Sequence, residues 1–585
     1  MLICPRKVSE VARTFIKHLQ LPEVKDDSEA ANASSISVAL HAVFRYISVG
    51  SSKARAAVTS QEEFSREKRA SDAASTLKAI EADFWTWRLQ DAPQFATAVG
   101  DPRHNDVLES YDISVYKERE LDQQIALLRH AISIGHTLNN VSVMAVPGQI
   151  DQIVQTSVQN SPLYQPAFTT TLDDSDVPVN KRVTMRSQAE AAVDEVYKAL
   201  IRLKNVLEQE YIPAGRATWG VSGWPDGKAL YEQCLKYHTS TDMTPQQVHD
   251  LGIREVQRIQ TNMLETLKRL QYNGTIKEFY DSVRVDPRFH ANSSEALLDM
   301  FKDYIYNRIT PKLNTLFKDI PDLPLKVEPM PYDGPGGIYL AGTPDGSVPG
   351  IFYANVMHPA QTVTLSDMAL VLHETVPGHH LQSIFSLSSN LPPYRGLVED
   401  DHYYRMPATF PINTAYLEGW GLYAEYLGEE MGMYTDDYML MGRYSFEIFR
   451  ACRLVVDTGL HYFGWDRERA IQYFLDNTAE SRDSMTTEVD RYLTWPGQAT
   501  AYKVGEIRIR ELRQKASDAL GSKFDVREFH SVLLKNGGMP LNLLERLVDE
   551  WIADVTSGAA GVTSDSAGVT SGTSSTGPPR GPPIG

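Results

Sequence analysis

The chain has 585 residues, and its 57 Lys and Arg residues against 75 Asp and Glu residues give a formal net charge of −18. This acidic balance argues against nucleic acid or an anionic membrane surface as a partner. The three cysteines, Cys4, Cys234 and Cys452, are too few and too far apart for a disulfide framework or a cysteine-based zinc site. No signal-peptide core and no long apolar stretch occurs, so we expect a soluble cytoplasmic protein. Nothing in the sequence indicates an oligomeric state.

The two ends of the chain differ from its body. Residues 1–60 are polar and rich in Ser and Ala, which predicts a poorly ordered extension. Residues 556–585 contain no aromatic residue and a near-repeat of GVTS, which predicts a disordered tail. Between the ends we expect an N-terminal helical lobe over 61–325 and a catalytic lobe over 326–555.

Helical patterns dominate the body of the chain. Residues 187–213 carry apolar side chains three and four residues apart and end on Pro213, as an amphipathic helix does. Thr244, Pro245 and Gln247 supply an N-cap, a first-turn proline and a capping-box partner for another helix. The predicted fold is mainly α, with two helical lobes around a deep cleft.

Residues 326–355 are the exception to the helical pattern. Runs of β-branched and aromatic residues alternate there with Pro-Asp-Gly and Gly-Pro turn signals. This predicts a small β-hairpin or sheet next to the helix that follows. An edge strand at that place could hold an extended peptide through main-chain hydrogen bonds, and a plain connecting hairpin is the alternative.

The helix after this sheet contains an altered zinc-binding motif. A capping-box-like start at Thr364 predicts a helix through His373 and Glu374. The motif H-E-x-x-H places two metal-binding histidines one turn apart with the glutamate as base, but Pro377 stands four residues after His373. In a straight helix His380 would lie about 10.5 Å further along the axis, whereas two nitrogens on one zinc ion lie only about 3.3 Å apart.

Pro377 and Gly378 offer a way to restore the motif. Pro377 cannot donate to the carbonyl of His373, and Gly378 tolerates backbone angles that other residues avoid, so a break is inexpensive there. With two residues absorbed in the break, we expect His379 to act as the second ligand. His380 would then be a neighbour behind the ligands or in contact with substrate. A chance meeting of His-Glu and His-His on an ordinary buried helix is the alternative.

A second helix offers the third ligand. Glu418 and Glu425 are seven residues apart and therefore share one helix face. Two histidines and one glutamate, with a position open to water, form the ligand set of a hydrolytic zinc site. Because Glu418 stands among aromatic residues, we favour it as the third ligand of one Zn²⁺ and take Glu425 as a supporting or structural residue.

Further polar residues follow on a later helix. Arg453, Asp457 and His461 recur every four residues on an otherwise apolar segment. We expect an ion pair between Arg453 and Asp457 with little functional weight. His461 could stabilise an oxyanion, or it could be a satisfied core histidine.

Side chains around a second Pro-Gly pair complete the candidates. A hydroxyl of Tyr492 or Tyr502 could donate to the oxyanion, and Arg491 or Lys503 could anchor a substrate carboxylate. Gln498 belongs to the same group of polar residues. Aromatic residues near helix ends are mostly part of a core, which is the alternative for each tyrosine.

Four ordered stretches resemble the family called domain of unknown function 885, whose members are considered relatives of gluzincin-type zinc metallopeptidases. A stretch at 84–101 resembles the N-terminal region of that family, so the resemblance spans about residues 80 to 550, without residues 1–60 and the tail. The four stretches are HETVPGHH at 373–380, YLEGWGLYAE at 416–425, RLVVDTGLHYFGW at 453–465 and RYLTWPGQATAYKVG at 491–505.

The resemblance implies His373, His379 and Glu418 as ligands and Glu374 as the general base. We therefore expect a zinc-dependent hydrolase that cleaves peptide or other amide bonds, with short peptides as substrates, by water activated on the metal. A biosynthetic metalloenzyme that acts on a small amide or amino-acid conjugate is one alternative. A non-catalytic helical scaffold is the other.

Overall fold

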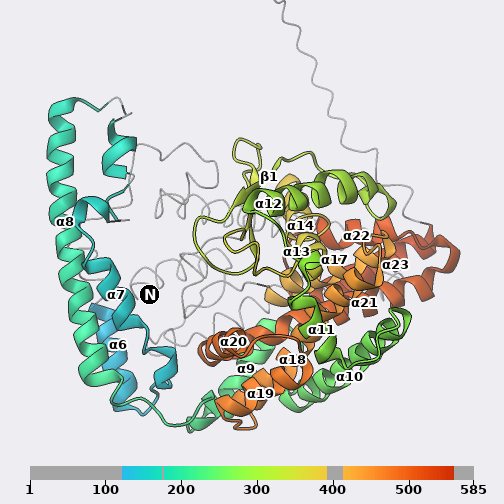
Figure 1. Cartoon of the computed structure of the whole chain (residues 1–585), viewed down its shortest axis with the longest axis horizontal. Coiled ribbons are helices and arrows are strands. Elements are labelled where there is room, and N and C mark those ends of the chain that lie inside the picture. Colours follow the sequence, from blue (N-terminus) through green and yellow to red (C-terminus); the bar gives the residue numbers. More distant parts are fainter. Residues whose placement is uncertain are drawn as a thin grey trace, which may run out of the picture.

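The computed structural model describes residues 122–558, apart from 162, 166, 174, 176, 390 and 392–412. The expected extension at 1–60, nearly all of the expected tail and the stretch at 84–101 lie outside these residues. The described chain is mainly α, as predicted, and carries one small sheet (Figure 1). None of the described helices is both long and apolar enough to cross a membrane.

The first three α-helices of the described residues lie to one side of the body (Figure 1). The longest of them confirms the helix predicted over 187–213, and it passes into a π-helical turn at Leu207–Tyr211. A small core that includes Ile150 and Tyr211 joins the three helices. They are α6 (Asp122–Ser133), α7 (Val146–Val154) and α8 (Val179–Val206).

A second group of helices packs around the long helix α18 (Asp437–His461). Within it, α10 (Pro245–Arg269) begins with the predicted capping box between Thr244 and Gln247. Because α10 lies along α18, helices from before and after residue 325 share one core. The other members are α9 (Gly227–Thr239), α11 (Ile276–Arg284), α19 (Arg467–Asn477) and α20 (Arg482–Thr494).

The predicted β segment is a mixed sheet of three strands within the described residues. Strand β3 (Gly350–Ala354) lies in the middle, parallel to β1 (Leu325–Pro329) and antiparallel to β2 (Gly337–Leu340). The sheet is therefore a hairpin of β2 and β3, with β1 added on the other side of β3. Helix α12 (Ser294–Lys302) contacts β1, and α13 (Asp367–Glu374) contacts β2, which is an edge strand.

The largest core joins this sheet to the helices that carry the altered zinc motif. Its centre is the pair α17 (Thr414–Glu430) and α21 (Ala501–Leu520), which lie side by side. Gly419 and Gly505 allow this, because a Cβ added to Gly419 would lie only 2.5 Å from the backbone of Gly505. The remaining helices of this core are α14 (His379–Ser388), α22 (Val526–Leu534) and α23 (Leu541–Ser557).

Candidate metal centre

The predicted helix break forms between α13 and α14. Helix α13 ends at Glu374, α14 begins at His379, and Gly378 has φ −76° and ψ −132°. A Cβ on Gly378 would lie 1.8 Å from the carbonyl oxygen of His373, so only glycine fits there. The indole N–H of Trp420 donates to the carbonyl of Pro377 at 2.9 Å and ties the break to α17.

The start of α13 differs from the prediction. Residues Thr364–Ser366 form a 3₁₀ turn, and α13 begins after Ser366 without a side-chain cap. The capping box expected at Thr364 is therefore wrong, because the 3₁₀ turn leads directly into the helix. The direction of α13 and the position of His373 on it are as expected.

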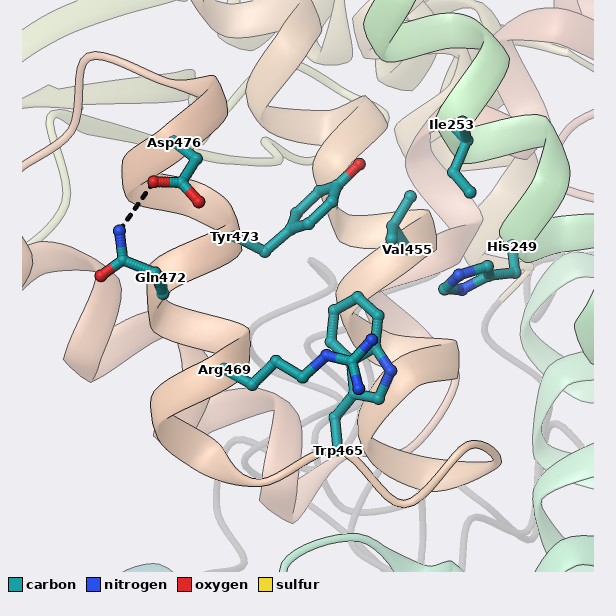
Figure 2. A pocket seen from close by; sticks show the side chains of 8 residues that line it. All are labelled: His249, Ile253, Val455, Trp465, Arg469, Gln472, Tyr473 and Asp476. Atoms are coloured by element: carbon teal, nitrogen blue, oxygen red, sulfur yellow. Dashed lines mark hydrogen bonds between the residues drawn. The ribbon is translucent and has the colours of Figure 1, made fainter.

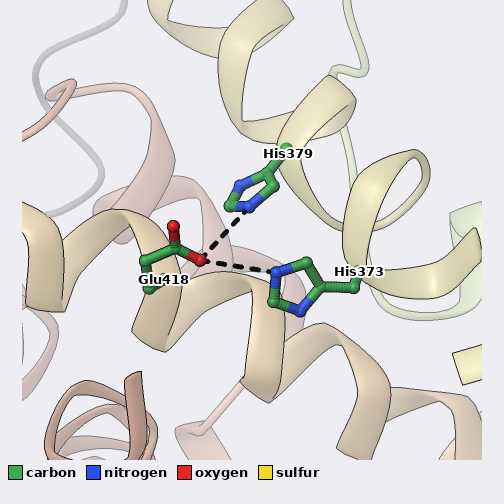
Figure 3. Close-up of side chains that lie close together, drawn as sticks. All are labelled: His373, His379 and Glu418. Carbon is green, nitrogen blue, oxygen red and sulfur yellow. Dashed lines mark ion pairs between the residues drawn. The ribbon is translucent and has the colours of Figure 1, made fainter. Parts of the chain in front are cut away.

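His379, His373 and Glu418 meet at the break (Figure 3). One ligand atom from each lies within 4.8 Å of the other two. Oε2 of Glu418 is 3.4 Å from Nε2 of His373 and 3.6 Å from Nε2 of His379. These separations are close to the roughly 3.3 Å between two ligand atoms of a tetrahedral zinc ion. The residues therefore fit a single cation.

The side chains of this cluster are not equally accessible. The side chain of His373 is 5% exposed, while those of His379 and Glu418 are 18% and 23% exposed. The cluster is therefore closed behind His373 and open on the side of the other two residues. A ligand from solvent would approach from that side.

Both histidine rings are held through Nδ1, which leaves Nε2 facing Glu418. Nδ1 of His373 lies 2.8 Å from Oε1 of Glu425, and Nδ1 of His379 lies 3.4 Å from Oε1 of Gln382. Such partners fix the tautomer and orientation of metal-binding histidines. Gly421 leaves room for the ring of His373, since a Cβ there would lie 2.6 Å from Cε1 of the ring.

The charges within the cluster act strongly on one another. Burial would lower the pKa of His373, but hydrogen bonds to Glu418 and Glu425 raise it to about 9. Burial would raise the pKa of Glu418, but hydrogen bonds to both histidines hold it well below its usual range. Burial raises the pKa of Glu374, against the opposing charges of the two histidines.

Arg450 of α18 is part of this centre, although it was not among the residues selected from the sequence. Its Nη2 lies 3.5 Å from Oε1 of Glu425, and its charge acts on Glu374. Arg450 thus acts on two of the three carboxylates of this centre, Glu425 and Glu374, while Glu418 faces the two histidines. One guanidinium leaves an excess of negative charge, which suits a cation. The sequence signal was available, because Arg450 precedes Arg453 by one helical turn on a mostly apolar helix.

His380 points away from the cluster toward the sheet. Its Nδ1 lies 3.2 Å from the hydroxyl of Tyr339 on β2, and a Cβ on Gly350 would come within 2.9 Å of the same nitrogen. Burial lowers the pKa of His380 to about 4. The structure therefore groups His379, not His380, with His373.

The polar residues predicted on α18 bond to groups of other elements. Arg453 donates from Nε to the hydroxyl of Tyr492 at 2.9 Å, and its Nη2 lies 3.2 Å from Glu488. Asp457 accepts a hydrogen bond from the hydroxyl of Tyr231 at 2.6 Å, and burial raises its pKa to about 7. The expected ion pair between Arg453 and Asp457 is wrong, because neighbouring helices supply better-placed partners.

His461 and Tyr492 are committed to structural hydrogen bonds. Nδ1 of His461 accepts from the N–H of Val221 at 3.2 Å, and Nε2 donates to the carbonyl of Tyr492 at 3.0 Å. The hydroxyl of Tyr492 donates to Glu488 at 2.6 Å. Contrary to expectation, neither side chain has a free donor for an oxyanion.

Lys503 is buried in an ion network and does not reach a substrate. Its Nζ lies 2.7 Å from Glu447, 2.9 Å from Glu506 and 3.2 Å from Glu255. Arg258 pairs with both Glu255 and Glu447. These five residues are called the Lys503 network. The expectation that Lys503 anchors a substrate carboxylate is wrong, because fully or largely buried carboxylates of the protein already balance its charge.

Tyr502 lies near Glu418 and near two arginines. Its hydroxyl accepts from Nε2 of Gln498 at 3.4 Å, and Oε1 of Gln498 is 3.1 Å from Nη1 of Arg491. Cζ of Arg453 lies 4.6 Å from the centre of the Tyr502 ring. Burial and the charge of Glu418 raise the pKa of Tyr502. Its phenol therefore stays protonated and can act as a donor beside Glu418.

A separate hollow of about 440 Å³ lies between α10, α18 and α19 (Figure 2). Arg469 stacks on Trp465 there, with Cζ 4.1 Å from the ring centre. None of the candidate site residues lines it. The lining residues are His249, Ile253, Val455, Trp465, Arg469, Gln472, Tyr473 and Asp476.

Solved structures of other proteins resemble this fold. A crystal structure of a candidate lipoprotein from Colwellia psychrerythraea is 32% identical, with a TM-score of 0.67 over 74% of this chain and 74% of that chain. A candidate lipoprotein of unknown function from Shewanella oneidensis is 20% identical, with a TM-score of 0.51 over 68% of this chain and 73% of that chain. At its lower identity, the second structure supports the fold alone.

The family assignment follows from the sequence match. No curated protein matches the chain. Residues 12–548 match the model of a family described as bacterial protein of unknown function (DUF885). The match begins at residue 12, so the expectation that residues 1–60 lie outside the family pattern is wrong for most of that segment. The chain therefore belongs to the DUF885 family of bacterial proteins.

Proposed function

We propose that the protein is a zinc-dependent hydrolase of peptide or other amide bonds, with short peptides as substrates. The observation that carries the proposal is the meeting of His373, His379 and Glu418 at ligand spacing beside the half-buried carboxylate of Glu374. This combination supplies a metal-binding set and a base in one place.

The three clustered residues would hold the metal ion. When bound, zinc lowers the pKa of a coordinated water and polarises a substrate carbonyl. Glu425 and Gln382 keep the rings of His373 and His379 turned toward Glu418. The supporting hydrogen bonds allow the site to form without reorganising the helices.

Glu374 would move the proton during hydrolysis. It accepts a proton from the attacking water as the water oxygen bonds to the carbonyl carbon. It then passes this proton to the amide nitrogen as the carbon–nitrogen bond breaks, which leaves a carboxylic acid and an amine. The raised pKa of Glu374 suits this exchange, because a carboxylate with a raised pKa takes up a proton more readily. The hydroxyl of Tyr502 would donate to the developing oxyanion.

A comparison of two glutamine variants tests the proposal. Purified protein loaded with Zn²⁺ is assayed against a panel of short peptides and N-acyl amino acids, and its zinc content is measured. Glu374→Gln should keep the metal and lose about 10²- to 10⁴-fold in kcat, the usual contribution of a general base. Glu430→Gln on α17, whose carboxylate pairs with Arg513, is the matched control and should stay active.

Two results would overturn the proposal. One is wild-type protein that binds no zinc and is indifferent to chelators. The other is Glu374→Gln protein with full activity on a cleavable peptide. The expected cytoplasmic location is part of the same proposal, and cell fractionation tests it, since both structural relatives are described as candidate lipoproteins.

A further inference from the structure

Two arginines beside the metal centre share a single carboxylate oxygen. Nη2 of Arg453 and Nη2 of Arg491 each lie 3.2 Å from Oε2 of Glu488. The same oxygen also accepts a hydrogen bond from Tyr492 at 2.6 Å. Within the described part of the chain, Glu488 is the only carboxylate at ion-pair distance from either guanidinium. The group therefore carries one more positive than negative charge.

Arg453 also has an unused donor. The residue is only 7% exposed, and its buried Nη1 has no hydrogen-bond partner among the residues that the structure describes. A buried guanidinium N–H without an acceptor is costly, and a carboxylate matches the paired N–H groups of a guanidinium. This place thus has the charge and the donor for an anionic group.

Both arginines reach Tyr502, whose pKa is also raised by the charge of Glu418. Arg453 stacks on the Tyr502 ring, and Arg491 reaches the Tyr502 hydroxyl through Gln498. The close contact of α17 with α21 holds the first turn of α21 next to Glu418. An anion on the arginines would therefore be a near neighbour of a carbonyl at the metal cluster.

We propose that Arg453 and Arg491 bind a free carboxylate of the substrate, so that the bond cleaved is the amide next to that carboxylate. The substrate class is then a peptide cleaved at its last bond or an N-acyl amino acid. Both present an amide carbonyl and an α-carboxylate one residue apart, and both release a free amino acid. This inference rests on the proposed function and adds the substrate specificity of the proposed site.

Matched substrates with a free or a blocked C-terminus test the inference. Zinc-loaded full-length protein is assayed with an acetylated tripeptide and an acetylated amino acid, each as free acid and as carboxamide. The free acid should have a kcat/KM about 10- to 100-fold higher than the carboxamide, because a hydrogen bond between charged groups contributes about this much binding free energy. Comparison of the tripeptide with the acetylated amino acid distinguishes the two sources of the carboxylate.

Arg491→Gln should remove this preference mainly by raising KM for the acids, with little change for the carboxamides. Arg491→Lys should restore part of it, because the charge returns without the two-pronged geometry. Arg467→Gln is the matched control, since Arg467 is paired one to one with Asp490. It should keep the preference of the wild type.

Equal turnover of acid and carboxamide by the wild type would overturn the inference and leave the proposed function standing. If no compound is cleaved, the proposed function fails, and binding decides the inference separately. Titration calorimetry on Glu374→Gln protein should then show tighter binding of the acetylated acid than of its carboxamide. Equal binding, or tighter binding that survives an added Arg491→Gln change, would overturn the inference.

Discussion

Two clusters of buried carboxylates in this molecule differ in what balances their charge. In the Lys503 network, Glu255, Glu447 and Glu506 surround the ammonium of Lys503. Glu255 and Glu447 also pair with the guanidinium of Arg258. The carboxylates raise the pKa of Lys503 even though burial opposes this. The groups of the network therefore keep their charges and hold three helices together.

The metal centre has the same number of carboxylates but less positive charge. Glu374, Glu418 and Glu425 face Arg450 and two histidines that must be neutral to bind a metal. Burial raises the pKa of Glu374, as is frequent at functional sites. Buried charge alone therefore does not distinguish the proposed metal centre from the Lys503 network. The proposed centre differs by an excess of negative charge at the spacing of metal ligands.

Removal of Lys503 should give the largest effect and should act on stability alone. In Lys503→Met, Glu447 and Glu506 lose their buried ammonium partner, which should lower the free energy of unfolding by about 3–5 kcal/mol. Zinc content should not change. Urea unfolding followed by circular dichroism measures the first quantity, and metal analysis measures the second.

Lys515→Met on the same helix is the control for this change. Lys515 is 43% exposed and pairs with Glu545 and Asp549 at the surface, so its loss should cost less than about 1 kcal/mol. If the two variants are equally stable, the Lys503 network does not stabilise the fold and the contrast with the metal centre disappears.

His379→Ala should break the other cluster and leave the fold. Structural zinc sites contribute about 10–16 kcal/mol over four ligands, so the loss of one ligand should weaken zinc binding by about 100- to 1000-fold. Unfolding of the metal-free protein should change little, because His379 is partly exposed. Competition with a zinc chelator measures the affinity.

The matched variant is His380→Ala, one residue further along. It removes a side chain that contacts Tyr339 and not Glu418. It should therefore retain zinc affinity within a few-fold. An equal loss of zinc in both variants would mean that the ligand set differs from the one proposed.

Glu425→Gln should have a smaller effect on the same centre. The change keeps the volume of the side chain but removes the charge that faces Nδ1 of His373. Loss of such a supporting group weakens metal binding by about 10- to 100-fold. Glu429→Gln, one turn further along α17 and paired with Arg443, is the control. Unchanged zinc affinity in Glu425→Gln would show that Glu425 only stabilises the fold.

The parts of this arrangement that depend on local sequence could be predicted. Pro377 and Gly378 break the helix because one lacks an N–H and the other lacks a Cβ that would collide with a carbonyl. The capping box at Thr244 likewise needs only neighbouring residues. The grouping of Glu418 with His379 could be predicted because zinc is bound by only a few types of side chain.

The parts that depend on distant partners could not be predicted. Lys503 meets Glu255, which lies far away in sequence on α10, and no local pattern reports this packing. Arg453 has Asp457 one turn away, yet it turns to Glu488 on α20. A helix pattern shows which residues share a face, but the partner of that face is decided by tertiary packing.

The smallest expected effect concerns the pH dependence of stability, where His461 contrasts with the carboxylate-bound histidines. Both of its nitrogens bond to backbone groups, and burial lowers its pKa to about 4, below the value of 6.5 for an exposed histidine. Its contribution is therefore fully present above about pH 6.5 and is lost as the pH falls toward 4. The expected slope is at most about 1.4 kcal/mol per pH unit.

Urea unfolding at pH 6.5 and at pH 4.5 measures this slope in the wild type and in His461→Gln. Glutamine cannot take up a proton, so the variant should lose less stability than the wild type between the two pH values. Its stability at pH 6.5 should nevertheless be lower than that of the wild type. His136→Gln is the control, because His136 is partly exposed and pairs with Asp226, which raises its pKa. Removal of that ring should not make the slope shallower. Parallel slopes for wild type and His461→Gln would mean that the buried ring of His461 is not the group that titrates between these pH values.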